Sequence, residues 1–248
     1  DNQFIRIDNQ GIYILTNNKW EYSLNHNLDF DSYEFDFLET DDKTYLISKG
    51  GGKVMLYQNN TISIIDNSHE WKSRYEADIF LRNDTIYSFG GYGYFNFKND
   101  LLFFDKKTGE WNLDKKFEAI KNRSKSIGFY NKSKNEYFFG LGKNKEGALQ
   151  DLYKYNFNQE TLKQLGSITE ELNEYIIVPN YNYPLLVTKE KIFLLNFENN
   201  TIREYTNPNL IIESAEKITY NKKLDQFLIN KNTSTELKNQ VLLKSIDL

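Results

Sequence analysis

The chain of 248 residues carries 31 basic and 35 acidic residues, which gives a formal net charge of -4. Because it has no excess of positive charge to neutralise a phosphate backbone, we expect no nucleic acid among its partners. The sequence has no cysteine, which excludes disulfides, thiolate nucleophiles and zinc sites built on sulfur.

The aromatic content indicates a strand-rich protein. The chain has 18 Tyr, 18 Phe and 3 Trp but only 3 Pro and 1 Met, and aromatic side chains favour the half-buried surfaces of pleated strands. The longest apolar runs are short segments such as Leu101–Phe104, whereas a membrane-spanning helix needs roughly 18 apolar residues. We therefore expect an all-β chain with no membrane span in it, folded as a single domain over residues 1–248.

The same short hairpin recurs along the chain. Each copy has an apolar anchor near the end of one strand, a polar turn, and a second apolar anchor that begins the next strand. Three of the turns contain an Asn-Asn pair, and asparagine tolerates the positive φ that tight hairpin turns require. The anchor pairs, in chain order, are Leu15 and Trp20, Tyr57 and Ile62, Phe104 and Trp111, Tyr155 and Leu162, and Leu195 and Ile202.

A sixth copy, aligned through its earlier half, places Ile246 at the next first anchor. The first anchors then follow one another at roughly 40 to 50 residues, the length of one four-stranded propeller blade. In the third repeat we expect strands over residues 74–81, 85–91, 99–105 and 110–114. The first repeat shows only its last three strands and the sixth only its first three. The spacing predicts a β-propeller of six blades with incomplete first and last repeats, and five or seven blades also fit.

The third repeat resembles the kelch repeat family. Its glycine pair Gly90-Gly91 ends the second strand, Phe104 stands on the third strand, and Trp111 begins the fourth. The other copies match through their spacing and through partial glycine pairs at residues 50–52 and 140–142. The resemblance implies a kelch-type β-propeller in which glycines let a wide loop leave the blade and large aromatic side chains fill the space between blades.

Few residues are suited to catalysis. The two histidines are His26 and His69, and a Ser-His-Asp arrangement would need one of them. Among kelch enzymes, the copper oxidases rely on a cysteine crosslinked to tyrosine, which this chain lacks, whereas the sialic acid epimerases use charged side chains in the central channel. We therefore expect a non-catalytic protein, with a sugar-converting enzyme similar to these epimerases as the alternative.

The acidic clusters of the sequence lack the spacing of a calcium loop. Asp29 and Asp31 are the best metal candidates among them. We expect neither a metal site nor a cofactor.

Two arginines stand at equivalent places in adjacent repeats. Arg74 and Arg123 each begin an expected inner strand, so both side chains should approach the same rim of the central channel. One interpretation is a salt bridge or a solvated rim. The other is a clamp for a carboxylate or another anion, because the planar guanidinium presents a fork of donors.

The loop between the second and third strands of the third repeat is rich in aromatic residues. It carries Tyr92, Tyr94, Phe95 and Phe97, and in propellers this loop opens on the same face as the loop that enters each inner strand. Exposed aromatic side chains on a rigid scaffold are favoured anchors for protein or sugar partners. The alternative is that half of these rings pack under the loop and stabilise it.

These features predict a recognition module that binds a protein segment, or a small sugar or anionic ligand, on the loop face of the propeller. The resemblance to bacterial kelch proteins implies an extracytoplasmic location, in the periplasm or at the cell surface, as part of a larger sensor or surface protein; a cytoplasmic location is the alternative. The expected ligand-binding residues are Arg74, Tyr92, Tyr94, Phe95, Phe97 and Arg123.

Overall fold

The computed structural model describes residues 5–8, 11–17, 19–24, 35–40, 42–49, 52–59, 61–69, 73–168, 172, 175–178, 184–188, 191–196, 201–206, 215–221, 226–231 and 239–240. All the secondary-structure elements within these residues are β-strands. The chain groups into two compact units: unit 1 consists of Asp1–Asn25 and Leu172–Leu248, and unit 2 of His26–Glu171.

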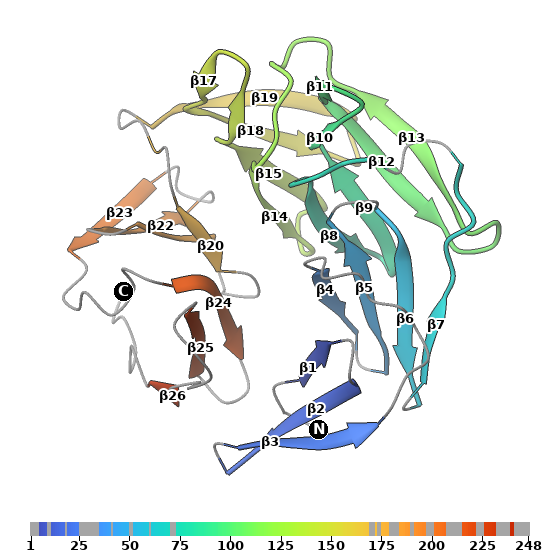
Figure 1. The fold of residues 1–248 in the computed structure, drawn as a ribbon. Helices are drawn as coiled ribbons and strands as arrows, with labels where there is room; N and C mark the ends of the chain where they lie inside the picture. Colours follow the sequence, from blue (N-terminus) through green and yellow to red (C-terminus); the bar gives the residue numbers. More distant parts are fainter. Residues whose placement is uncertain are drawn as a thin grey trace. The chain divides into compact units, whose positions relative to one another are not determined.

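Unit 2 contains three four-stranded antiparallel sheets (Figure 1). The first sheet has β4 (Phe35–Glu39), β5 (Thr44–Ser48), β6 (Val54–Gln58) and β7 (Thr61–Ile64). The second has β8 (Asp78–Arg82), β9 (Thr85–Phe89), β12 (Asp100–Asp105) and β13 (Glu110–Lys116). The third has β14 (Ile127–Asn131), β15 (Glu136–Gly140), β18 (Asp151–Asn156) and β19 (Thr161–Ser167). The inner strand β8 contacts the inner strands β4 and β14, so the three sheets follow one another in the manner of propeller blades.

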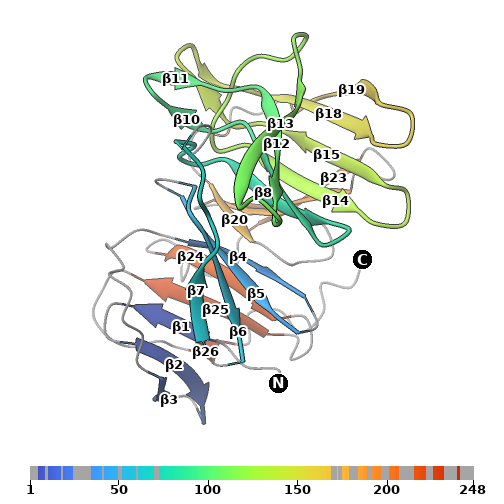
Figure 2. The same cartoon turned by 90° about the vertical axis from the view of Figure 1, so that its right-hand side faces the viewer.

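Two short hairpins project from unit 2 between the second and third strands of their sheets. The first pairs β10 (Tyr92–Gly93) with β11 (Asn96–Phe97), and the second pairs β16 (Lys143–Asn144) with β17 (Gly147–Ala148). Both lie at the same end of unit 2 in the two views (Figures 1 and 2).

Unit 1 contains one four-stranded sheet and two three-stranded sheets. The four-stranded sheet has β20 (Ile176–Val178), β21 (Leu185–Val187), β22 (Lys191–Asn196) and β23 (Thr201–Thr206). The three-stranded sheets have β1 (Ile5–Asp8), β2 (Gly11–Thr16) and β3 (Lys19–Leu24), and β24 (Ala215–Asn221), β25 (Gln226–Lys231) and β26 (Asn239–Gln240).

The predicted fold class, an all-β protein with propeller-like antiparallel sheets, is confirmed. The predicted number of blades is corrected: the described residues form four complete four-stranded blades, not six. The difference arises because the sheets of β1–β3 and β24–β26 have three strands each, at the places where the sequence has its incomplete first and last repeats. The single domain over residues 1–248 stays a prediction.

The hairpin anchors found in the sequence are cross-strand neighbours. All five pairs face each other in the strand register: Leu15 and Trp20, Tyr57 and Ile62, Phe104 and Trp111, Tyr155 and Leu162, and Leu195 and Ile202. Four of the turns between them contain a residue with positive φ, namely Asn17, Asn59, Gly109 and Glu160. An apolar cross-strand pair therefore marks all five hairpins, and a left-handed turn residue accompanies it in the four turns with such a residue described. The sixth anchor, Ile246, lies outside the described residues.

Aromatic side chains fill the space between the blades of unit 2. Phe80 of β8 stacks on Tyr137 of β15 with ring centroids 4.2 Å apart, and Tyr137 stacks on Phe139 at 4.9 Å. Trp111 is only 4% exposed, and its indole nitrogen donates a hydrogen bond to the Gly52 carbonyl of the preceding sheet at 2.8 Å. Large rings thus tie one blade to the next, as the composition indicates.

Across the described residues we find no helix with the length and apolar character that crossing a membrane requires.

Candidate functional site on the loop face

One end of unit 2 gathers the segments that enter the inner strands and those that join second to third strands. We call this end the loop face; it comprises residues 52–53, 73–77, 90–99, 117–126 and 141–150. Isolated backbone bridges join Tyr75 to Tyr92, Lys98 to Arg123, and Ser124 to Lys143. The β10–β11 hairpin is therefore held between two neighbouring segments, and the segment on its far side also supports the β16–β17 hairpin.

Arg74 lies in the loop before β8, and not on the inner strand as the sequence suggested. The chain turns there, because the Ala77 amide donates to the Arg74 carbonyl at 3.3 Å and Glu76 has a φ of 55°. The side chain is buried, and its guanidinium contacts an Asp100 carboxylate oxygen at 2.8 Å and the Gly90 carbonyl at 2.9 Å. Burial lowers the pKa of Arg74, and the charge of Asp100 counteracts this effect.

Arg123 has the same role in the next sheet. Its side chain is fully buried, and its two terminal nitrogens each donate to an oxygen of Asp151 at 2.8 Å. It also donates to the Leu141 and Lys121 carbonyls, both at 3.1 Å. Burial alone would raise the pKa of Asp151, but the hydrogen bonds and charge of Arg123 outweigh it and lower that pKa.

The two pairs, Arg74–Asp100 and Arg123–Asp151, form what we call the arginine latches. Each joins the loop that enters an inner strand to the first residue of the third strand in the same sheet. This arrangement is the salt-bridge interpretation that the sequence left open. We had not predicted the partners, although an Asp-Leu dipeptide opens the third strand in both sheets.

The aromatic loop forms the β10–β11 hairpin, whose two-residue turn projects rings into solvent. Tyr94 and Phe95 occupy the turn with φ of 50° and 63°, the left-handed pair that tight primed turns use and that side chains other than glycine rarely adopt. Phe95 is 92% exposed, Tyr94 68% and Tyr92 37%. Phe97 is partly buried, with its ring centroid 4.9 Å from that of Tyr92. Two of the four predicted rings thus project fully, and Phe97 packs beside Tyr92.

Tyr75 belongs to the same aromatic surface, although we had not predicted it. It is 49% exposed, and its backbone exchanges two hydrogen bonds of 2.8 Å with that of Tyr92. Only the backbone pairing of two loops brings it there, so no local sequence pattern marks it.

Glycines let this hairpin lie close to its neighbours. A Cβ added to Gly93 would lie 1.8 Å from the Ser73 carbonyl oxygen, and one added to Gly90 would lie 2.8 Å from the Arg123 carbonyl oxygen. The Arg123 carbonyl also accepts a hydrogen bond from the Gly91 amide at 2.8 Å, and Ser73 lies two residues before the Tyr75–Tyr92 bridge. The position of the hairpin is therefore set by backbone contacts with the neighbouring loops and does not depend on its own side chains.

Substituting Gly93 with alanine is expected to detach the hairpin without removing an aromatic ring. The clash should cost about 1–3 kcal/mol, so the Tyr75 and Tyr92 amides should exchange hydrogen roughly 5 to 150 times faster. Gly147→Ala, in the neighbouring β16–β17 hairpin, is the control: its φ of 124° strains an alanine locally, but no atom lies within 4 Å of the added Cβ, so the Tyr75 and Tyr92 amides should keep their protection. Unchanged protection in Gly93→Ala, measured by hydrogen exchange, would contradict the assignment.

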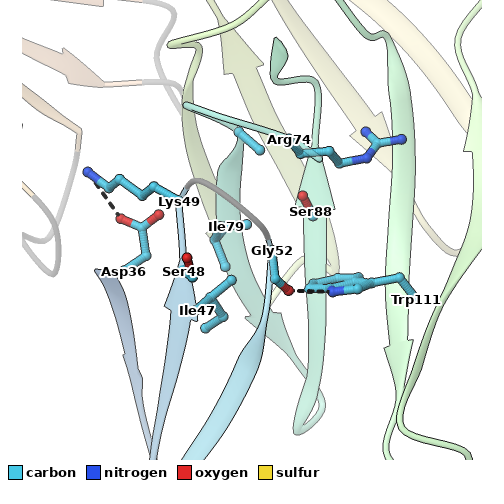
Figure 3. A pocket seen from close by; sticks show the side chains of 10 residues that line it. Asp36, Ile47, Ser48, Lys49, Gly52, Arg74, Ile79, Ser88 and Trp111 are labelled. Carbon is cyan, nitrogen blue, oxygen red and sulfur yellow. Dashed lines mark hydrogen bonds and ion pairs between the residues drawn. The ribbon is translucent and has the colours of Figure 1, made fainter. Parts of the chain in front are cut away.

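A small cavity lies behind the loop face, beside Trp111 (Figure 3). Its space for solvent amounts to about 10 Å³, enough for about one water molecule. The Lys49 ammonium lies 3.6 Å from an Asp36 carboxylate oxygen at its edge. A sugar ring does not fit in this space. The cavity is lined by Asp36, Ile47, Ser48, Lys49, Gly52, Arg74, Ala77, Ile79, Ser88 and Trp111.

A carboxyl group with an unusual environment lies at the start of β8. Asp78 accepts a hydrogen bond of 2.5 Å from the Tyr137 hydroxyl, and its carboxylate occupies the space that a side chain at Gly128 would fill. Burial, with a smaller contribution from the charge of Asp36, raises the pKa of Asp78 to about 7, although the Tyr137 hydrogen bond lowers it. This group connects the second sheet to the third.

The described residues contain no group of three or more His, Asp or Glu side chains placed to hold a metal ion. His69 is exposed. His26, Asp29 and Asp31 lie outside the described residues.

Comparison with known proteins identifies the fold. No protein-family model and no curated protein sequence matches the chain. Among solved structures, that of YjhT is similar, with a TM-score of 0.60 and 11% sequence identity over 79% of this chain and 71% of YjhT. YjhT is a β-propeller, and at this identity the likeness shows the β-propeller fold alone.

Proposed function

We propose that the protein is a kelch-like β-propeller that acts as a non-catalytic recognition module, and that it binds a protein segment through the β10–β11 hairpin. Two features of the third repeat support the kelch assignment. Gly90 leaves room for the neighbouring Arg123 carbonyl, and Trp111 is buried between blades. Gly90 and Trp111 are among the residues that carry the resemblance to the kelch family, and both have a structural role here.

The exposure of Phe95 carries the functional part of this proposal. A phenylalanine that is 92% exposed at the tip of a fixed hairpin leaves a large apolar surface in water, which is unfavourable unless a partner covers it. Buried aromatic anchors supply most of the binding energy in protein interfaces. Because the turn is already held in place, little conformational entropy is lost when a partner binds.

The composition of the hairpin also favours a protein segment. Residues 90–97 consist of Gly, Tyr, Phe and Asn, similar to antibody binding loops, where Tyr supplies rigid contact area and Gly and Asn supply adaptable backbone and hydrogen bonds. Small ligands instead prefer concave sites of several hundred Å³. The projecting hairpin and the cavity of about 10 Å³ do not fit that description, so we prefer a protein segment to a small sugar.

The proposal is tested by selecting binders from a displayed library of random 12-residue peptides. We expect selected peptides to bind the wild-type protein and to lose at least about tenfold in affinity for Tyr94→Ala/Phe95→Ala, because a central aromatic anchor contributes 2 kcal/mol or more. Leu113→Ala is the control, since Leu113 is an exposed apolar residue on the outer strand β13. Peptides that bind the double variant equally well would contradict the proposal. Hairpin-dependent binding on a glycan array, with no peptide selected, would favour the sugar alternative.

A further inference from the structure

The described residues of the loop face have the opposite charge to the chain as a whole. Apart from the two latch arginines, which are paired with aspartates, it carries six lysines and three glutamates, while the whole chain has a net charge of -4. The lysines are Lys53, Lys98, Lys121, Lys125, Lys143 and Lys145, and the glutamates are Glu76, Glu118 and Glu146.

Each of the three glutamates is matched by a lysine. Glu146 lies 3.0 Å from Lys121, and Glu76 lies 3.7 Å from Lys143. Glu118 lies 3.3 Å from Lys116, which ends β13 just outside the face. The glutamates of the face are therefore paired locally, and its described residues carry three more lysines than glutamates.

Part of this positive charge lies beside the aromatic hairpin. Lys98 directly follows β11, and its backbone bridges Arg123. Lys143 and Lys145 belong to the β16–β17 hairpin, which pairs through Ser124 with the same segment. A segment that covers Tyr94 and Phe95 and extends over the neighbouring loop would therefore meet these lysines.

We infer that the protein segment bound by the hairpin is acidic, with an apolar residue that contacts Tyr94 and Phe95 and flanking Asp or Glu residues that face Lys98 and Lys145. This inference rests on the proposed function of the hairpin. Complementary charge of this kind accelerates association and selects among partners.

An anionic membrane or polysaccharide fits the same face less well. The three glutamates lie on three of the five segments of the face, and the lysines paired with them are less available to a uniformly anionic surface. A peptide places its carboxylates individually and avoids the glutamates. The aromatic tip projects only two rings, which suits a single apolar residue of a segment.

The test uses the selected peptides and two charge-reversal variants. We expect the selected sequences to be enriched in Asp and Glu, and their affinity to fall at least about tenfold between 50 and 300 mM NaCl. Lys98→Glu/Lys145→Glu should weaken binding at least about tenfold, mainly through slower association. Lys107→Glu/Lys132→Glu, which reverses two exposed lysines in the turns β12–β13 and β14–β15, should change affinity less than about twofold.

The outcomes separate this inference from the proposed function. Neutral or basic peptides whose binding needs Tyr94 and Phe95 but ignores salt would overturn the acidic partner and leave the recognition role intact. Binding that ignores Tyr94 and Phe95 would overturn the recognition role. A third outcome is that no peptide binds, whereas vesicles with 30% phosphatidylserine, or polygalacturonate, bind in a manner that depends on Lys98. This outcome would overturn the inference that the partner is an acidic protein segment.

Discussion

Replacing Arg123 with methionine is expected to lower the free energy of unfolding by about 3 kcal/mol. The substitution leaves the carboxylate of Asp151, whose side chain is 18% exposed, without its bidentate partner. It also leaves the Leu141 and Lys121 carbonyls without the guanidinium donors that they accept from. For a cooperative unit of about 150–250 residues the change corresponds to a fall in melting temperature of roughly 6–12 °C, and urea unfolding measures the change in free energy directly.

The double variant Arg123→Met/Asp151→Leu is the control for this prediction. Removing both charges should recover much of the lost stability, because an unpaired buried charge costs more than replacing the whole pair with apolar side chains. Arg123→Lys should recover less than half, since an ammonium lacks the planar fork. A loss below about 1 kcal/mol for Arg123→Met, as for an exposed ion pair, would show that the latch is not structural.

The latch also supports the aromatic hairpin. The Arg123 amide donates to the Lys98 carbonyl, and its carbonyl accepts from the Gly91 amide, both at 2.8 Å. Loosening Arg123 therefore loosens both ends of the loop that carries Tyr94 and Phe95. We expect Arg123→Met to weaken peptide binding as well, although the buried guanidinium has no access to a ligand.

Local patterns in the sequence predicted the repeat well. The anchor pairs, such as Phe104 and Trp111, lie on either side of a short turn, so the pattern of apolar residues and turn residues determines which of them face each other. The glycine pair and the aromatic loop are also local features. For this reason the sequence led to the four-stranded blade and to the aromatic loop, although it did not tell which of the four rings are exposed.

Contacts between distant residues were beyond this kind of reasoning. The latch partners Arg74 and Asp100 are 26 residues apart, and Asp78 and Tyr137 are 59 apart. In the sequence, a buried aspartate has the same appearance as a solvated one, since burial depends on which blade packs beside it. The same limit explains why the arginines were predicted as ligand-binding residues: the sequence placed them at the starts of the inner strands, whereas they lie in the preceding loops, and it did not indicate the aspartates that pair with them.

The stability of the protein is expected to fall as the pH rises from 5 to 8, because of Asp78. Its pKa of about 7 in the folded protein lies above the ordinary value of 3.8, so the folded state holds this proton more tightly than the unfolded state. The resulting stabilisation is fully present below about pH 4 and is lost as the pH passes 7. A shift of this size corresponds to about 4 kcal/mol; because Asp78 keeps some exposed surface, we expect about half of that.

Melting temperatures at constant ionic strength between pH 5 and pH 8 measure this effect. Asp78→Asn keeps an acceptor for the Tyr137 hydroxyl but carries no charge, so it should be more stable than wild type at pH 8 and should lose most of the pH dependence. Glu118→Gln, which removes an exposed carboxylate, should keep the wild-type slope of melting temperature against pH.

Tyr137→Phe removes the hydrogen bond that lowers the pKa of Asp78. In this variant the loss of stability with rising pH should therefore occur at a higher pH than in the wild type. The same slope in Asp78→Asn and wild type would show that another group titrates, and the contact between the second and third blades would then not depend on this proton.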